Sequence, residues 1–121
     1  NHKRFSDKLI KITCQAEILS NIKCVTLQEV VISSGTKIPN SAFDGCIGIS
    51  KVTIADSVTE IGESAFEGLT SLESIVIPGS VKTIGEKAFK DCTNLKSVTM
   101  PTKVLKIKES AFTSFLNFLP P

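Results

Sequence analysis

Residues 72–94 read LESIVIPGSVKTIGEKAFKDCTN, and the chain repeats this stretch several times. The pair Ala-Phe within it recurs at a fixed interval of 23 residues. The four copies are Ala42-Phe43, Ala65-Phe66, Ala88-Phe89 and Ala111-Phe112. A fixed period of this length marks a repeat architecture. In a solenoid most apolar residues pack one repeat on the next, so specificity is left to the outward positions.

Aligned on the Ala-Phe pair, the units 27–48, 49–71, 72–94 and 95–117 share several apolar columns. The column members are Leu27, Ile49, Leu72, Leu95; Val30, Val52, Ile75, Val98; Ile32, Ile54, Ile77, Met100; and Ile38, Ile61, Ile84, Ile107. Alternation such as Val52-x-Ile54 predicts a short strand with one buried face. Stacked copies of it predict a parallel sheet along one side.

The Ala-Phe segment is too short for an independent helix, so we expect one helical or 3₁₀ turn there, packed by its Phe. Stacked repeats then place the Phe side chains in a ladder through the interior. Gly62 and Gly85 follow the last isoleucine column, where we expect a tight turn with positive φ. Pro39 and Lys108 replace these glycines in the other two units, so the turn is less well specified there.

The columns L-x-S-V-x-I-P, V-x-x-I-G-x-x-A-F and G-C or D-C resemble the BspA-like (treponemal-type) class of leucine-rich repeats. Residues 72–94 match it nearly throughout, and the resemblance covers about residues 27–119. It implies a β-rich leucine-rich repeat solenoid of the α/β repeat class, with short parallel strands on one face and short helical or 3₁₀ turns on the other.

The same resemblance implies a curved, non-catalytic scaffold without a cofactor, taken from a cell-surface or secreted adhesin. Its partner would be a protein ligand, such as an extracellular matrix or host surface protein. The alternative is a structural spacer or self-assembly element, including one in an intracellular scaffold, that associates through an uncapped C-terminal edge near Phe115 and Phe118.

The chain of 121 residues is expected to be one domain of stacked units. Residues 1–26 do not fit the period, although residues 9–13 (LIKIT) predict a strand, so we interpret them as an N-terminal cap or a degenerate repeat. Residues 27–121 hold four repeats of 22–23 residues and the start of a fifth at Phe118. We expect a processed protein or a fragment whose last repeat continues in a longer chain.

The charges are unevenly distributed along a chain of net charge +2. Residues 1–26 carry five basic and two acidic side chains, residues 49–71 one and four, and residues 95–121 four and one. This pattern indicates either solvated faces or an electrostatic stripe for a partner. Nucleic acid is disfavoured as a partner because Trp and Tyr are absent and the lysines are dispersed. No apolar run is long enough to predict insertion into a membrane.

The four cysteines predict no catalytic or metal site. Cys46 and Cys92 share a column two repeats apart, roughly 10 Å, which is beyond disulfide reach and favours small buried core residues. Cys14 and Cys24 lie in the N-terminal segment, where they either pair as a disulfide of the cap or stay free. The single His, His2, is a poor general base near a chain end.

An enzyme is not predicted either. Glu60, Glu63 and Glu67 form the one acidic group in a single repeat, and they fall on turn positions typical of a solvated face.

The remaining candidate for a function is the outward side of the strands. If Val52 and Ile54 point inward, their neighbours point outward and form a patch three residues wide. We predict a protein-binding face made of Glu29, Val31, Lys51, Thr53, Ser74, Val76, Ser97 and Thr99, with Ser33, Ala55, Pro78 and Pro101 as its third column. Few charges make such a face inexpensive to desolvate, although β-propensity alone selects the same residues.

Overall fold

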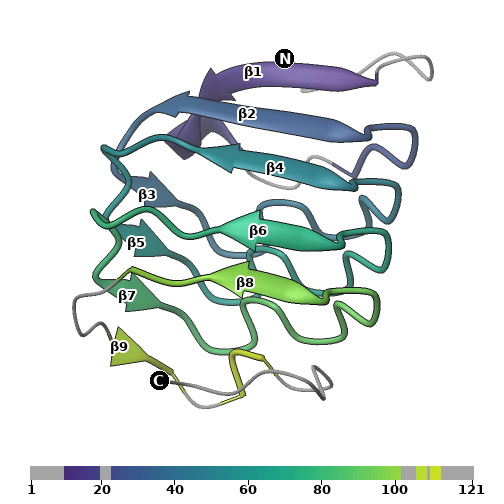
Figure 1. Ribbon diagram of the computed structural model, residues 1–121. Helices are drawn as coiled ribbons and strands as arrows, with labels where there is room; N and C mark the ends of the chain where they lie inside the picture. Colours follow the sequence, from purple (N-terminus) through teal and green to yellow (C-terminus); the bar gives the residue numbers. More distant parts are fainter. Residues whose placement is uncertain (1–9, 20–22, 102–105, 109, 113–121) are drawn as a thin grey trace.

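The fold is a solenoid of parallel strands in a computed structural model that describes residues 10–19, 23–101, 106–108 and 110–112 (Figure 1). Five strands stack on one side: β1 Lys11–Gln15, β2 Glu29–Ser34, β4 Lys51–Ile54, β6 Ser74–Val76 and β8 Ser97–Thr99. Four shorter strands stack on a second side: β3 Lys37–Ile38, β5 Glu60–Ile61, β7 Thr83–Ile84 and β9 Lys106–Ile107. We call the outward surface of the first group the strand face, and the second group the back sheet.

The repeats stack in register, as the shared columns predict. Val30 and Ile32 on β2 lie opposite Val52 and Ile54 on β4 in a parallel ladder. β1 joins the same ladder, with Ile12 opposite Val30. The strand expected at residues 9–13 is therefore present, displaced to Lys11–Gln15.

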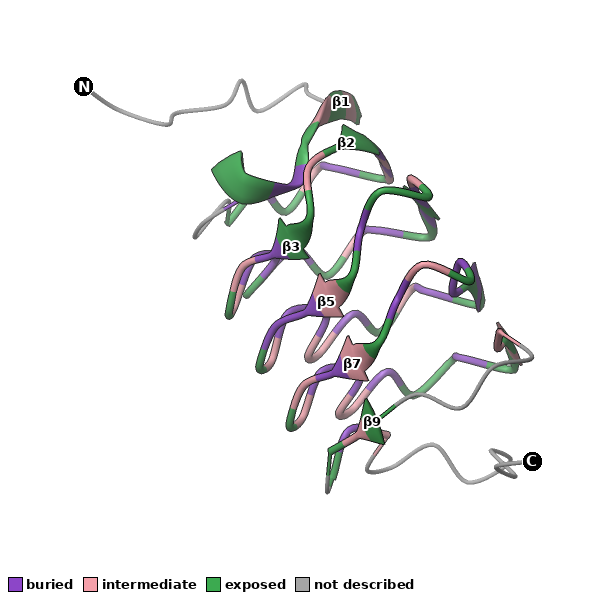
Figure 2. Cartoon of the chain, turned by 90° about the vertical axis from the view of Figure 1, so that its left-hand side faces the viewer, coloured by how far each residue is buried: buried purple, intermediate pink, exposed green. Residues whose placement is uncertain are grey.

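The back sheet is a feature that the alignment of apolar columns did not predict. Its strands are only two residues long and place Ile38, Ile61, Ile84 and Ile107 in one parallel ladder. The isoleucines point inward, and the preceding residue of each strand points away from the core. The coil thus buries its interior between two ladders instead of between one sheet and a layer of helical turns (Figure 2).

A ladder of phenylalanines runs through the interior, as predicted. The ring centroids of Phe43 and Phe66 are 5.5 Å apart, those of Phe66 and Phe89 5.1 Å, and those of Phe89 and Phe112 5.0 Å. The rings are nearly parallel, and Phe43, Phe66 and Phe89 are fully buried. Each ring therefore packs on the ring of the next repeat, which makes the repeats dependent on one another for stability.

The expected helical turns at the Ala-Phe pairs are not confirmed. Residues 63–68 and 86–91 form consecutive hydrogen-bonded turns, and the one helix among the described residues is the 3₁₀ segment η1, Ala16–Ile18. The reason is a left-handed residue directly before each alanine, with positive φ at Ser41, Ser64, Lys87 and Ser110. A residue in this conformation interrupts a right-handed helix, so the chain reverses in turns instead.

The expectation of positive φ at Gly62 and Gly85 is wrong, because neither adopts the left-handed conformation. These glycines are needed for close approach between repeats. A Cβ on Gly85 would lie 2.7 Å from the backbone nitrogen of Glu63 and 2.7 Å from the carbonyl carbon of Gly62. Lys108 occupies the same column, and its amide donates to Ile84 O at 2.9 Å as that of Gly85 does to Ile61 O at 2.8 Å.

Replacing Gly85 by alanine is expected to destabilise the fold by about 1–3 kcal/mol, because the new methyl group must push two stacked backbones apart. The matched control is Gly79→Ala, where an added Cβ would meet nothing within 4 Å. Urea denaturation followed by circular dichroism measures both. Equal stabilities of the two variants would contradict the close-approach explanation.

The cysteines are all free in the described structure. Cys46 and Cys92 are buried, in agreement with their prediction as core residues. The alternative of a Cys14–Cys24 disulfide is not realised. Cys14 lies on the inner side of β1 opposite Ile32, whereas Cys24 contacts Cys46 in the column of turns.

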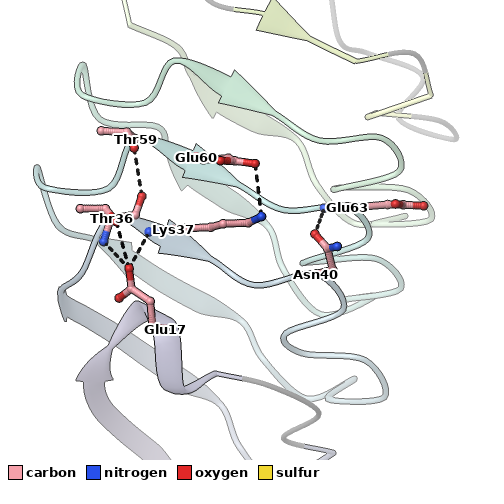
Figure 3. A network of polar contacts seen from close by, with 7 residues as sticks. All are labelled: Glu17, Thr36, Lys37, Asn40, Thr59, Glu60 and Glu63. Atoms are coloured by element: carbon pink, nitrogen blue, oxygen red, sulfur yellow. Dashed lines mark hydrogen bonds and ion pairs between the residues drawn. The ribbon is translucent and has the colours of Figure 1, made fainter.

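The carboxylate of Glu17 caps the back sheet at β3, its first strand in the chain (Figure 3). Between later repeats, the amides of Thr59 and Glu60 both donate to Thr36 O, at 2.8 and 3.2 Å. At the first strand, Glu17 Oε2 takes the place of that carbonyl. It accepts from Thr36 N at 2.8 Å, Thr36 Oγ1 at 3.0 Å and Lys37 N at 3.1 Å. Glu17 on η1 therefore pairs backbone donors that an open sheet edge would expose.

These hydrogen bonds, led by that from the Thr36 amide, hold the pKa of the Glu17 carboxyl below its ordinary value of 4.5. A lowered pKa in the folded state stabilises the fold above the ordinary pKa, and the contribution disappears as the pH falls through the folded value. Glu17→Gln is therefore expected to lower the Tm near neutral pH, with the difference from wild type shrinking in acid below pH 4.5. Thermal unfolding at both pH values measures it, with the exposed Glu63→Gln as control. A Tm difference that is unchanged in acid would refute a role of the carboxylate charge.

Candidate functional site: the strand face

The eight predicted residues lie together on the strand face. Glu29 and Val31 are half-buried on β2, and Lys51 and Thr53 are exposed on β4. The other four are exposed on β6 and β8: Ser74, Val76, Ser97 and Thr99. The ladders align them in two columns, because Glu29 is opposite Lys51 and Val31 opposite Thr53, while Ser74 is opposite Ser97 and Val76 opposite Thr99.

The column of outward residues that contains Val31 is one residue longer than predicted. Thr13 on β1 lies opposite Val31, so Thr and Val alternate along Thr13, Val31, Thr53, Val76 and Thr99. Val76 is the most exposed of the valines in this column, with 61% of its surface accessible. The alternation of residues 9–13 was the signal for Thr13, but residues 1–26 do not fit the repeat period, which hid its register with Val31.

Charges gather at one end of the face. Lys11 Nζ lies 3.9 Å and Lys51 Nζ 4.0 Å from Glu29 Oε2. Such exposed pairs add little stability. The end formed by β6 and β8 instead carries Ser74, Val76, Ser97 and Thr99, so it presents hydroxyls and a methyl surface without charge.

The expected third column does not belong to the face. Pro78 is buried, and Ala55 and Pro101 are half-buried; only Ser33 is exposed. The physical reason is that β4 and β6 end one or two residues earlier and the chain turns inward there. Val58 N bonds Ala55 O, and Val81 N bonds Pro78 O. The patch is two residues wide, not three.

A hollow interrupts the face between β4 and β6. The ladder of β1, β2 and β4 ends there, and β6 and β8 form a separate pair. A cavity of about 330 Å³ opens at this seam, lined on its outer side by Lys51, Thr53, Asp56, Ser74 and Val76. The alignment of repeats gives no signal for this interruption, because both strands keep the apolar pattern of their neighbours.

A larger groove, of about 650 Å³, lies where the strands begin, away from the centre of the strand face. It is lined by Ile10, Val25, Gln28, Ser50, Glu73 and Asn94. Val25 is 63% exposed, and Ile47 stands exposed 22 residues later in the same column. The repeat pattern of the sequence does not indicate this groove, and we treat it as the competing site.

Other arrangements of ionisable side chains among the described residues do not suggest catalysis. Glu60 Oε2 lies 3.5 Å from Lys37 Nζ, and this ion pair joins two exposed side chains on neighbouring strands of the back sheet. Burial raises the pKa of the Cys92 thiol to about 11, which opposes formation of a nucleophilic thiolate. No group of three potential metal ligands occurs among the described residues. His2, Phe115 and Phe118 lie outside them.

Comparison with known proteins agrees with this architecture. The family model of the BspA-type leucine-rich repeat region matches residues 8–118 of this chain, as six copies of the repeat. A leucine-rich repeat protein from Bacteroides ovatus is 36% identical with a TM-score of 0.81, over 90% of this chain and 30% of that one. The T. pallidum leucine-rich repeat protein is 32% identical, with a TM-score of 0.72, over 86% and 47%.

A leucine-rich cell surface protein from Faecalibacterium prausnitzii is 31% identical with a TM-score of 0.73, over 87% of this chain and 30% of that one. The present chain thus spans less than half of each of these proteins. No curated protein gives a significant match. In the described part of the chain, no helix has the length and apolar character needed to cross a membrane. The repeats, the stacked parallel strands and the matched residues together show that this chain belongs to the BspA-type leucine-rich repeat family.

Proposed function

We propose that the chain is a non-catalytic protein-binding module of a cell-surface or secreted adhesin, and that it binds a protein ligand on its strand face. The observation that carries this proposal is the exposed Val76 beside the hollow at the β4–β6 seam. An exposed apolar side chain next to a concavity is a suitable centre for a protein interface, because both lose water when a partner side chain enters.

The surroundings of Val76 support a protein ligand. Ser74, Ser97 and Thr99 offer hydroxyls that exchange hydrogen bonds with a partner, and none carries a charge that must be desolvated. Lys51 and Asp56 lie at the rim of the hollow, where charges influence association rate and orientation more than affinity. Leucine-rich repeat proteins are in general interaction modules, which agrees with this division of roles.

The cellular location of the module is proposed from its similarity to a protein of known structure. The F. prausnitzii protein of the same fold is described as a cell surface protein. We extend that location to the present chain and infer an extracellular matrix or host surface protein as the ligand class. In this proposal residues 1–26 are a degenerate first repeat, since β1 extends the strand face with Thr13.

The proposal is tested by surface plasmon resonance of the whole chain on immobilised extracellular matrix and plasma proteins, at low and physiological salt. We expect saturable binding to one member of the panel that persists at physiological salt, because the centre of the face is uncharged. Binding to every surface at low salt only, or to none of them, would refute the proposal.

A further inference from the structure

Two free cysteines, Cys24 and Cys46, are in contact in the interior near the N-terminal end of the solenoid. Cys24 stands 22 residues before Cys46, which places it in the same column as Cys46, Leu69 and Cys92. The backbone amide of Cys24 donates to Cys46 Sγ at 3.2 Å. Cys46 is fully buried, and Cys24 retains 8% of its surface. The column of small core residues therefore contains a contact between two cysteines.

The geometry of stacked repeats suits a bond between these two sulfurs. Adjacent strands of a parallel stack lie about 4.8 Å apart, and disulfides bridge Cα atoms about 4.4–6.8 Å apart. Cys92 is excluded as a partner because Leu69 lies between it and Cys46 in the column. Cys14 is excluded because it lies on β1 opposite Ile32, in the strand ladder.

We propose that Cys24 and Cys46 are a cross-linking site that takes a small-molecule disulfide, such as oxidised glutathione, as its oxidant and forms an inter-repeat disulfide. The Cys24 thiolate attacks one sulfur of the oxidant, which gives a mixed disulfide and releases one thiol. The Cys46 thiolate then attacks the Cys24 sulfur and releases the second thiol. Two protein thiols and one oxidant disulfide thus become one protein disulfide and two small thiols.

The order of attack follows from the access that each thiol has to solvent. Cys24 is the more accessible of the two cysteines, and its Sγ lies 3.4 Å from Thr26 Oγ1 at the margin of the core, so the first attack falls to Cys24. Cys46 is fully enclosed, and burial raises the pKa of its thiol; both disfavour its attack on an oxidant from solvent and leave it the second, intramolecular step, in which its target is already in contact. For the bond to form, the Cys24 side chain must rotate from Thr26 toward Cys46.

The consequence of this bond is a fixed connection between the segment that follows β1 and the first full repeat. β1 is short of partners compared with the strands inside the stack, since β2 is its single ladder neighbour among the described strands. A cross-link after β1 restrains this end in the unfolded chain and so favours the folded state. The oxidised protein is expected to have a higher Tm than the reduced protein.

Trypsin separates all four cysteines, which makes the test direct. Cleavage after lysine places Cys14 in residues 12–23, Cys24 in 24–37, Cys46 in 38–51 and Cys92 in 91–96. The folded whole chain is equilibrated in glutathione redox buffer, alkylated, digested and analysed by mass spectrometry. We expect peptides 24–37 and 38–51 to be recovered as one species that lacks two hydrogens and separates on reduction.

Recovery of both peptides in alkylated form across the oxidising range would overturn the proposal, and so would a link from Cys24 to Cys14. The same holds for a link that appears only after unfolding in urea, since it would not reflect the folded contact. Thermal unfolding adds a second readout. Oxidation should raise the Tm of wild type and of Cys14→Ala but not that of Cys24→Ala; a rise in Cys24→Ala equal to wild type would also overturn it.

Discussion

Replacing Phe66 by alanine is expected to lower the free energy of unfolding by about 3–5 kcal/mol. Phe66 is fully buried, and its ring stacks on both Phe43 and Phe89, at centroid distances of 5.5 and 5.1 Å. Truncation leaves a cavity in the middle of the ladder. The neighbouring rings cannot close it, because each is held in its own repeat by the turns around it.

Urea denaturation measured by circular dichroism gives this loss directly. Phe66→Leu serves as the matched control, since it keeps a large apolar side chain and should cost less than the truncation to alanine. A loss below about 1 kcal/mol for Phe66→Ala would contradict the ladder as the element that holds the repeats together.

Replacing Val76 by arginine is expected to weaken binding to the protein ligand at least tenfold, about 1.4 kcal/mol. The new side chain places a charge and a long stem at the edge of the hollow, on the uncharged part of the strand face. Stability should change by less than about 0.5 kcal/mol, because the position is 61% exposed. Loss of affinity without loss of stability identifies a contact surface.

Val25→Arg is the matched control for this experiment. Val25 is also an exposed valine, 63% accessible, but it lines the groove of about 650 Å³ that lies where the strands begin. The variant should bind like wild type in surface plasmon resonance. If Val25→Arg abolishes binding and Val76→Arg does not, the groove and not the strand face is the binding site.

The sequence was sufficient to predict those parts of the fold that recur in every repeat. The apolar alternation at Val52 and Ile54 predicted the parallel strands, and the Ala-Phe column predicted the phenylalanine ladder. Both features could be predicted because equivalent positions are buried in every repeat, and burial requires the same type of residue at each of them. The back sheet was missed because its strands of two residues are too short to show alternation.

The turns and glycines were harder to predict because backbone geometry decides them. Ser64 and Lys87 adopt positive φ although neither residue type favours it, so no residue preference signals the break in the helix. Gly62 and Gly85 were correctly singled out but for the wrong reason, since the restriction comes from the neighbouring repeat and not from their own φ. The distance between stacked repeats is set by tertiary packing, so the sequence of a single repeat does not reveal it.

The candidate site was predictable as a set of outward residues but not as a shape. The two columns on the strand face followed from alternation. The hollow arises from an interruption between β4 and β6, and the capping role of Glu17 from a contact 19 residues away with Thr36. Neither leaves a pattern in the sequence, because each depends on how one pair of elements is placed.

The most direct test of the strand face as a binding surface is a methyl NMR titration of the isotope-labelled chain with the ligand that binds in the panel. The valine and isoleucine methyl groups report both candidate surfaces in one experiment. We predict that the methyl resonances of Val31 and Val76 shift or broaden on saturation, while those of Val25 and Ile10, which line the groove, remain unchanged. Changes confined to Val25 and Ile10 would contradict this prediction and assign binding to the groove.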